Sequence, residues 1–185
     1  MKVRETELSG VLIIEPDAYH DKRGFFMESY NQRGYKELGI KESFVQDNLS
    51  FSAKGVLRGL HFQSPRPQGK LVQVLLGEVF DVAVDIRVGS PTFGKWVGVT
   101  LSSDNKRQLY VPPDFAHGFV VTGDSALFAY KCTDYFFPNH SVAIAWDDPQ
   151  LGIKWPVAAP VLSDSDKAQP TLKDIDRNLL PTYKP

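Results

Sequence analysis

The stretch FDVAVDIR, residues 80–87, decides the fold class that this chain can adopt. Large apolar side chains occupy every second position of the stretch, namely Phe80, Val82, Val84 and Ile86, and the positions between them are mostly charged. Successive residues of a β-strand point to opposite faces of a sheet. This period of two therefore predicts a strand with one apolar face and one polar face.

Shorter stretches of the same kind recur on both sides of this strand. The further strands that we predict are 11–14, 25–30, 44–51, 57–62, 71–76, 96–101, 108–111, 119–121, 126–133 and 142–145. Turn-forming residues separate several of them, at 77–78, 89–91 and 102–105. Many short strands at such spacing are typical of an all-β sandwich or barrel.

Helical and linking segments are few. Residues 31–38 predict one short helix, which begins at Asn31 and stops at Gly39. From about residue 157 the chain is polar and contains prolines, so we expect this C-terminal tail to lie over the barrel or across a partner rather than to form the core. No repeat or linker divides the chain, and we expect residues 1–185 to form a single domain.

Composition narrows the classes of partner. With 42% hydrophobic residues, 23% charged residues and a formal net charge of -1, the chain has no overall basic field that would attract nucleic acid or a membrane. The single cysteine, Cys132, cannot form an internal disulfide and fits a reducing compartment, where we interpret it as a packing residue. No apolar run reaches membrane-spanning length and no signal-peptide core is visible, so we expect a cytoplasmic protein.

The segment RGLHFQSPRPQGK, residues 58–70, has the layout of an active site. A titratable base, His61, ends one predicted strand, and a fixed cation, Lys70, opens the next. A lone histidine is more often structural, but its crowded polar neighbours favour a functional role. Strict alternation would place Arg58 on the opposite strand face from His61. Gly59 offers a solution, because a glycine inside a strand often marks a β-bulge.

The predicted strand 44–51 carries hydrogen-bonding groups on one face. The side chains on this face are Gln46, Asn48 and Ser50, and those on the other are Asp47, Leu49 and Phe51. An amide-bearing surface therefore lies opposite a largely apolar one.

Several motifs in the same order resemble those of the dTDP-4-dehydrorhamnose 3,5-epimerase family, from about residue 10 to residue 167. The motifs are Arg23-Gly24-Phe25-Phe26 with Glu28, Gln46-Asp47-Asn48, residues 57–63, 68–72, 77–87, 111–113 and 116–119, Tyr130-Lys131, and Trp146-Asp147-Asp148-Pro149. The resemblance implies a cupin-type jelly roll with a few short helices and no metal or other cofactor. As partners it implies a dTDP-linked 4-keto-6-deoxy sugar and a second copy of the chain, with which the N-terminal strands could be exchanged.

The resemblance also implies catalytic roles. His61 resembles the base that removes the proton beside the sugar ketone, and Asp166 resembles the carboxylate that orients its imidazole. Tyr130 resembles the acid that returns a proton to the opposite face. Lys70 is placed to stabilise the enolate oxygen, which is usually the largest single term in such a reaction.

Further residues are implied as substrate contacts. They are Arg23 and Arg58 for the diphosphate, Phe26, Glu28, Gln46, Asp47, Asn48 and His117 for the nucleoside and sugar, and Lys70 and Lys167 as additional ligand contacts. At position 136 many family members carry a tyrosine, whereas this chain has Phe136. We expect Phe136 to contact the ligand, and a missing hydroxyl there could slow the second of two inversions.

We therefore expect an epimerase that inverts carbon 3 and carbon 5 of dTDP-4-dehydro-6-deoxy-D-glucose and gives dTDP-4-dehydro-L-rhamnose. Three alternatives stay open: inversion at only one of these carbons, a metal-dependent cupin, and a sugar-nucleotide binding module without catalysis. The metal-dependent alternative would usually show a His-x-His pair followed by a glutamate, and His61 has no such neighbour.

Overall fold

The computed structural model describes residues 1–184, and most of its regular structure is antiparallel strand. The strands are β1 (Lys2–Glu5), β2 (Leu12–Glu15), β3 (Ala18–Asp21), β4 (Gly24–Met27), β5 (Gln46–Ala53), β6 (Leu57–Gln63), β7 (Lys70–Asp85), β8 (Trp96–Ser102), β9 (Gln108–Val111), β10 (Phe115–Cys132) and β11 (Ser141–Ala143). The helices are α1 (Gln32–Glu37) and α2 (Asp164–Lys167), with 3-10 turns at Pro138–His140 and Arg177–Leu179.

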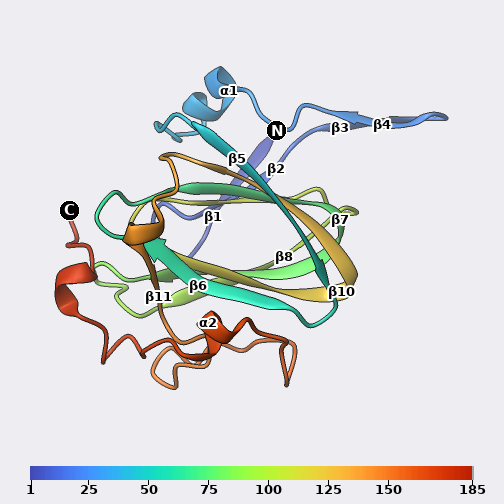
Figure 1. Ribbon diagram of the computed structural model, residues 1–185. Helices are drawn as coiled ribbons and strands as arrows, with labels where there is room; N and C mark the ends of the chain where they lie inside the picture. The colour runs from blue at the N-terminus through green and yellow to red at the C-terminus, as the bar shows by residue number, and fades with distance from the viewer. Residues whose placement is uncertain (185) are drawn as a thin grey trace.

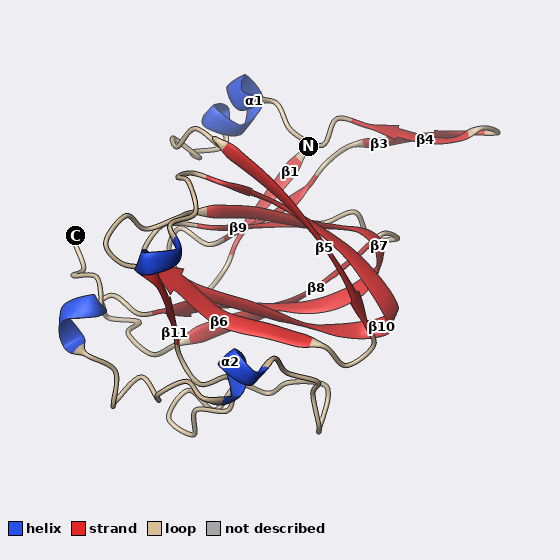
Figure 2. Ribbon diagram, viewed as in Figure 1, coloured by secondary structure: helices blue, strands red, loops and turns tan. Residues whose placement is uncertain are grey.

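All strands except β3 and β4 join one sheet, which folds over on itself as a jelly roll because its long strands β7 and β10 bend (Figure 1, Figure 2). Their order is β1-β2-β9-β7-β10-β6-β11, with β5 paired to β10 and β8 paired to β7. The predicted all-β class and the jelly-roll architecture are confirmed. Because β7 and β10 run through the middle of this order, their inward residues form both the core and the walls of the cavity described below.

Two long strands replace four of the predicted ones. Residues 71–76 and 80–87 belong mostly to β7, and residues 119–121 and 126–133 belong almost entirely to β10, so the turn predicted at 77–78 is wrong. Gly77 has a φ of +79°, and a Cβ there would lie 1.8 Å from the carbonyl oxygen of Ser125 on β10. The register of β10 on β7 shifts at the same level, between Val121 and Ala126. The glycine therefore bends the strand pair without ending it.

The N-terminal part of the chain contains the predicted helix and a hairpin that leaves the barrel. Asn31 begins α1 by accepting hydrogen bonds from the backbone N–H groups of Arg33 and Gly34. The hairpin β3–β4 extends away from the rest of the molecule (Figure 1), and its Phe25 and Phe26 are 57% and 72% exposed. Within residues 1–184, no helix is long and apolar enough to cross a membrane.

The C-terminal tail contributes to the core, which corrects our expectation that it would stay outside. Leu172, Ile175 and Leu180 are buried in one cluster with residues of β6 and β7, among them Leu60 and Val84. These three apolar residues are spaced irregularly in a polar segment. Their burial could therefore not be predicted from the hydrophobic periodicity of a strand or a helix.

Shortening a tail side chain should therefore destabilise the whole fold. We expect Ile175→Ala to lower the free energy of unfolding by about 2–4 kcal/mol, because it leaves a cavity in a packed cluster. Urea unfolding measures this change. The matched control is the exposed neighbour Lys173, whose change to alanine should stay within about 0.5 kcal/mol of the parent. Equal unfolding midpoints for the two variants would show that the tail is not part of the core.

Candidate active site

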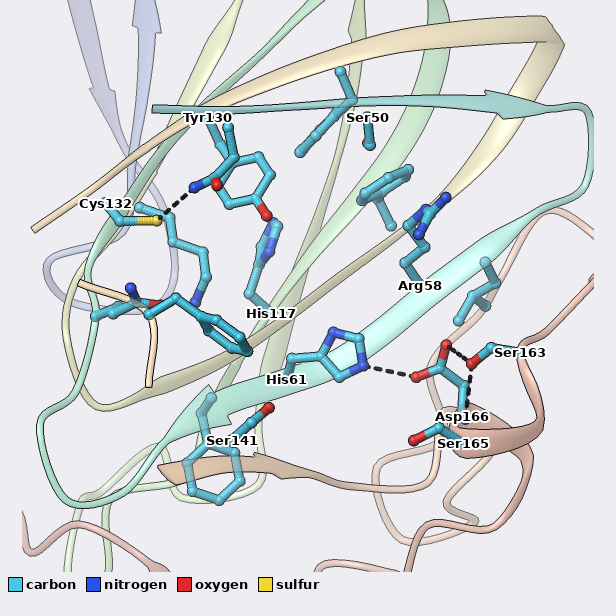
Figure 3. A pocket seen from close by; sticks show the side chains of 18 of the residues that line it. Ser50, Arg58, His61, His117, Tyr130, Cys132, Ser141, Ser163, Ser165 and Asp166 are labelled. Atoms are coloured by element: carbon cyan, nitrogen blue, oxygen red, sulfur yellow. Dashed lines mark hydrogen bonds and ion pairs between the residues drawn. The ribbon is translucent and has the colours of Figure 1, made fainter. Parts of the chain in front are cut away.

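A cavity of about 620 Å³ opens between β5, β6, β7 and β10 and is bordered by the C-terminal tail (Figure 3). The predicted site residues that line it are Gln46, Asn48, Arg58, His61, Lys70, His117, Tyr130, Phe136 and Asp166. A cavity of this size, with both polar and apolar walls, suits a small molecule rather than a polymer.

A β-bulge in β6 brings Arg58 and His61 to the same wall of the cavity. His61 pairs with His117 of β10, and Arg58 pairs with Phe119. The two pairs are therefore three residues apart along β6 but only two residues apart along β10. The predicted bulge at Gly59 is thereby confirmed. Gly59 has a φ of +130°, and a Cβ there would lie 2.5 Å from the Cα of Gly118. Only glycine can occupy this position without displacing β10.

His61 is held by a carboxylate from the tail. Its Nε2 lies 2.7 Å from Oδ1 of Asp166, whose side chain is 7% exposed. The other carboxylate oxygen, Oδ2, accepts a hydrogen bond of 2.8 Å from the hydroxyl of Ser163. Ser163 is also the N-cap of α2 and accepts from the backbone N–H of Asp166. Figure 3 shows this chain of contacts running from His61 to the tail.

The same strand that carries His61 also anchors the segment that carries Asp166. The backbone N–H of Leu57 donates to Val161 O at 2.9 Å, and Val161 N donates to Gly55 O at 2.8 Å. Two residues after this bridge, Ser163 begins α2. The histidine and its carboxylate are 105 residues apart in sequence, yet the elements that carry them are joined directly.

The pKa of Asp166 fixes the role of each histidine nitrogen. Burial alone would raise this pKa, but the hydrogen bonds from His61 and Ser163 outweigh burial and hold it below its ordinary value. An ionised carboxylate can only accept hydrogen bonds, so Nε2 of His61 carries a proton in this contact. In the neutral ring the other nitrogen, Nδ1, is then left as a base.

Lys70 is a buried cation without a partner. It opens β7, is 8% exposed, and its ammonium group makes no hydrogen bond or ion pair with any of residues 1–184. Burial lowers the pKa of Lys70, while the neighbouring Cys132 and Asp81 act in the opposite direction. A charge that is largely removed from water and has no protein partner is costly to the protein. Its position on the cavity wall suits an oxygen of a bound ligand.

Tyr130 and His117 project from β10 into the same cavity (Figure 3). Burial raises the pKa of Tyr130, so its phenol is protonated at neutral pH and can act as a donor. His117 is fixed by Asp81, whose two carboxylate oxygens lie 2.8 and 3.0 Å from its Nε2. Both members of this pair are buried, which makes His117 a rigid part of the wall.

The amide face of β5 forms the opposite wall, as its alternation predicted. Gln46 donates to Asn48 at 3.0 Å, and Asn48 in turn donates to the Cys132 sulfur at 3.6 Å. The hydroxyl of Ser50 is buried and has no hydrogen-bond partner within residues 1–184. Arg58 donates its Nε to Ser52 at 3.1 Å, which leaves its two terminal nitrogens available to a ligand.

Five of the predicted ligand contacts do not line the cavity: Arg23, Phe26, Glu28, Asp47 and Lys167. Asp47 points to the outer face of β5, where its carboxylate pairs with Lys131 at 2.9 Å. Arg23 and Phe26 lie on the protruding hairpin, where Arg23 pairs with Asp21. Lys167 is exposed and lies 3.1 Å from Asp164. Their roles in binding stay predictions.

Sequence reasoning assigned no functional role to several residues at the site. Those that line the cavity are Gln63, Gln68, Cys132, Ser141 and Ser163. A signal for Ser163 was present, because a serine followed three residues later by an acidic residue is the pattern of an N-terminal helix cap. No comparable local pattern announced the two glutamines. Among residues 1–184, no three His, Cys, Asp or Glu side chains come together as a metal site.

Comparisons with known proteins agree on one family. The family model described as dTDP-4-dehydrorhamnose 3,5-epimerase matches residues 5–174. A dTDP-4-dehydrorhamnose 3,5-epimerase from Pseudomonas aeruginosa is 54% identical over 178 residues, which are 95% of this chain and 98% of that protein.

Solved structures are similar over nearly the whole chain. The epimerase from Legionella pneumophila in complex with dTDP-4-keto-L-rhamnose is 56% identical, with a TM-score of 0.97 and coverage of 100% of this chain and 99% of that one. A 3'-monoepimerase from Streptomyces bikiniensis in complex with dTDP-quinovose is 33% identical, with a TM-score of 0.90 and coverage of 96% and 92%.

Removing the unpaired cation should stabilise the free protein. The pKa of Lys70 is lowered by folding, so its burial weakens the fold wherever the unfolded lysine is charged, and this penalty fades as pH rises toward about 10.4. We expect Lys70→Met to raise the free energy of unfolding at pH 7 by on the order of 1 kcal/mol. Urea unfolding of both proteins at pH 7 and pH 10 measures the effect. The control Lys131→Met removes a lysine that is paired with Asp47 and should not stabilise. A destabilised Lys70→Met protein would contradict the expectation.

Proposed function

The chain belongs to the dTDP-4-dehydrorhamnose 3,5-epimerase family, and on that premise we propose that it inverts carbon 3 and carbon 5 of dTDP-4-dehydro-6-deoxy-D-glucose. One observation carries the proposal. His61 held by Asp166, Lys70 without a partner, and a protonated Tyr130 face one cavity from three different strands. Together these groups supply a base, a stabilising cation and an acid.

The reaction begins at the carbon next to the ketone. Nδ1 of His61 takes the proton from this carbon, and the electron pair of the broken C–H bond forms an enolate. Asp166 stabilises the imidazolium that results, because its carboxylate is already ionised and only 2.7 Å from Nε2.

Lys70 carries the largest electrostatic contribution. The negative charge of the enolate collects on the former ketone oxygen, and the buried ammonium group of Lys70 can bind that oxygen. One such donor in a site shielded from water typically lowers a barrier by about 3 kcal/mol.

Tyr130 completes the inversion. The phenol of Tyr130 comes from β10, whereas the imidazole of His61 comes from β6. Tyr130 can therefore donate a proton to the face of the sugar carbon opposite to the face from which His61 removes one. The ketone forms again as the carbon–hydrogen bond is made. Tyr130 then regains a proton from water and His61 releases its own, which prepares the site for the second carbon.

Substrate binding uses the remaining walls. The free end of the Arg58 guanidinium suits the diphosphate oxygens, since its Nε is already held by Ser52. Gln46, Asn48 and His117 offer hydrogen bonds to the nucleoside and the sugar. The proposal gives Phe136 a place against a flat part of the ligand.

We also propose that two copies of the chain form the working enzyme. Arg23, Phe26 and Glu28 would then reach the cavity of the partner through the protruding hairpin. Two apolar surfaces support this arrangement. Phe25 and Phe26 are exposed on the hairpin, and Leu49 and Phe51 are 67% and 64% exposed on the outer face of β5.

A cytoplasmic location is part of the proposal. Its support is the single cysteine, which is buried and free. A protein that relies on no disulfide loses no stability when it folds in a reducing compartment.

Proton NMR of the sugar nucleotide in deuterium oxide tests the activity. We expect deuterium at carbon 3 and carbon 5 with the parent protein, and a loss of at least about 100-fold with His61→Ala. Tyr130→Phe should retain exchange through His61 but impair inversion. Tyr135→Phe is the matched control, since Tyr135 does not line the cavity, and it should behave as the parent.

The same spectra separate the alternatives. Label at one carbon alone would indicate a single-position epimerase, and binding without any label would indicate a non-catalytic module. Loss of exchange on chelation, restored by a divalent metal, would favour a metal-dependent cupin. A His61→Ala protein within tenfold of the parent, a difference below about 1.4 kcal/mol, would rule out His61 as the base.

Mixing two inactive variants tests the exchanged hairpin. In a mixed dimer of Arg23→Ala and His61→Ala chains, one of the two sites combines an intact His61 with an intact Arg23. Random pairing should therefore restore about a quarter of the parent activity. Sedimentation confirms that dimers form. No recovery after mixing, or a fully active monomer, would show that Arg23 does not act across a dimer.

A further inference from the structure

A loop without regular structure borders the mouth of the cavity. Residues 133–137 follow β10 and carry Phe136, which lines the cavity while 52% of its surface remains exposed. The backbone of this loop bonds to other backbone only at its two ends, where the N–H of Thr133 donates to Gly69 O and the carbonyl of Phe137 accepts from His140, so the conformation between these ends depends on other contacts.

Side-chain amides supply these contacts. The N–H of Phe136 donates to the oxygen of Gln46 at 2.9 Å, and the N–H of Phe137 donates to the oxygen of Gln63 at 2.6 Å. Gln63 also donates to the carbonyl of Tyr135 at 3.2 Å, and Gln68 donates to the carbonyl of Asp134 at 2.7 Å. Four backbone groups in a row are therefore bonded to three glutamines, which we call the glutamine brace: Gln46, Gln63 and Gln68.

The brace rests on rigid parts of the barrel. Gln46 begins β5, Gln63 ends β6, and Gln68 lies two residues before β7. Gln63 and Gln68 are 4% and 8% exposed and therefore sit firmly in the protein, and losing either amide leaves loop backbone groups without their protein partners.

Arg66 adds two contacts from the same stretch of sequence. Its guanidinium binds both carboxylate oxygens of Asp134 at 2.9 and 3.0 Å, and its Cζ lies 4.3 Å from the centre of the Phe137 ring. The connection from His61 to Lys70 thus carries, besides the base and the cation, three side chains that bind the loop: Gln63, Arg66 and Gln68.

We propose that Gln46, Gln63 and Gln68 are positioning residues that hold the ring of Phe136 against the planar base of the bound nucleotide and so set the affinity for it. This inference rests on the proposed function, which supplies the nucleotide. An aromatic platform on a mobile loop would have to be ordered during binding, and that ordering lowers affinity. The brace orders it beforehand.

Gln46 connects the loop to the opposite wall. Its oxygen binds the N–H of Phe136 and its nitrogen donates to Asn48 at 3.0 Å, so one amide hydrogen is left for a ligand. A ligand that contacts Asn48 is thereby coupled to the position of Phe136.

A double-mutant cycle on nucleotide binding tests the proposal. Calorimetry with dTDP alone gives the dissociation constants of the parent, Gln63→Met, Phe136→Ala and the double variant. We expect Phe136→Ala to weaken binding by about tenfold or more, as for other base–aromatic stacks. Gln63→Met should weaken binding by about three- to tenfold in the parent background and leave it unchanged in the Phe136→Ala background.

Kinetics provide the second readout. The brace is proposed to strengthen nucleotide binding equally in the ground state and in the transition state. Gln63→Met should therefore raise KM and leave kcat within about twofold. Gln68→Met acts on the same loop from a different element and replaces Gln63→Met if that variant does not fold.

The control is Asn105, another amide that satisfies the backbone of a loop but does not line the cavity. It accepts from the N–H groups of Ser102 and Arg107 and donates to the carbonyl of Thr100. Asn105→Leu should leave the dissociation constant unchanged. If the effects of Gln63→Met and Phe136→Ala multiply, the brace does not act through Phe136 and this proposal fails alone. A parent that does not bind dTDP overturns both this proposal and the proposed function.

Discussion

The close contact between Gly59 and Gly118 governs the geometry of the site. β6 and β10 approach so closely there that a Cβ on Gly59 would lie 2.5 Å from the Cα of Gly118 and 2.9 Å from the carbonyl oxygen of His117. The approach lets β6 insert one extra residue, and the insertion turns Arg58 toward the side on which His61 already lies. A regular strand would divide these two residues between the cavity and the opposite face. Proposed phosphate binding and proposed proton abstraction thus share one wall because two glycines lack side chains.

The carboxylate of Asp166 depends on a different kind of constraint. It comes from a tail of irregular structure, whose position is set by packing of Leu172 and Ile175 and by the backbone bridge between Val56 and Val161. Burial of the tail is therefore tied to the proposed catalytic role of Asp166 as well as to stability. The N-cap of the short helix α2 then orients the carboxylate, since Ser163 binds one oxygen of Asp166 and leaves the other for His61.

Features that depend on local pattern could be predicted from the sequence. The faces of β5, the bulge at Gly59 and the start of α1 at Asn31 each follow from neighbouring residues. Features that depend on distant partners could not. The bend at Gly77 is explained by its close contact with the carbonyl of Ser125, and the burial of the tail residues is explained by their packing against β6 and β7. The roles of Gln63 and Gln68 were equally hidden, because their partners lie in a loop about 70 residues later.

The unpaired state of Lys70 has a consequence for proton balance. In the free protein, burial favours the neutral amine, whereas an anionic oxygen bound beside it favours the ammonium form. Binding of the proposed ligand oxygen beside Lys70 would therefore raise the pKa of Lys70 and, in solutions alkaline enough to have deprotonated it, draw a proton from solvent. By linkage, acidification through that range tightens the complex. The resting site thus holds electrostatic free energy that only a ligand with a negative or partly negative oxygen can release, and this discriminates against neutral molecules of the same shape.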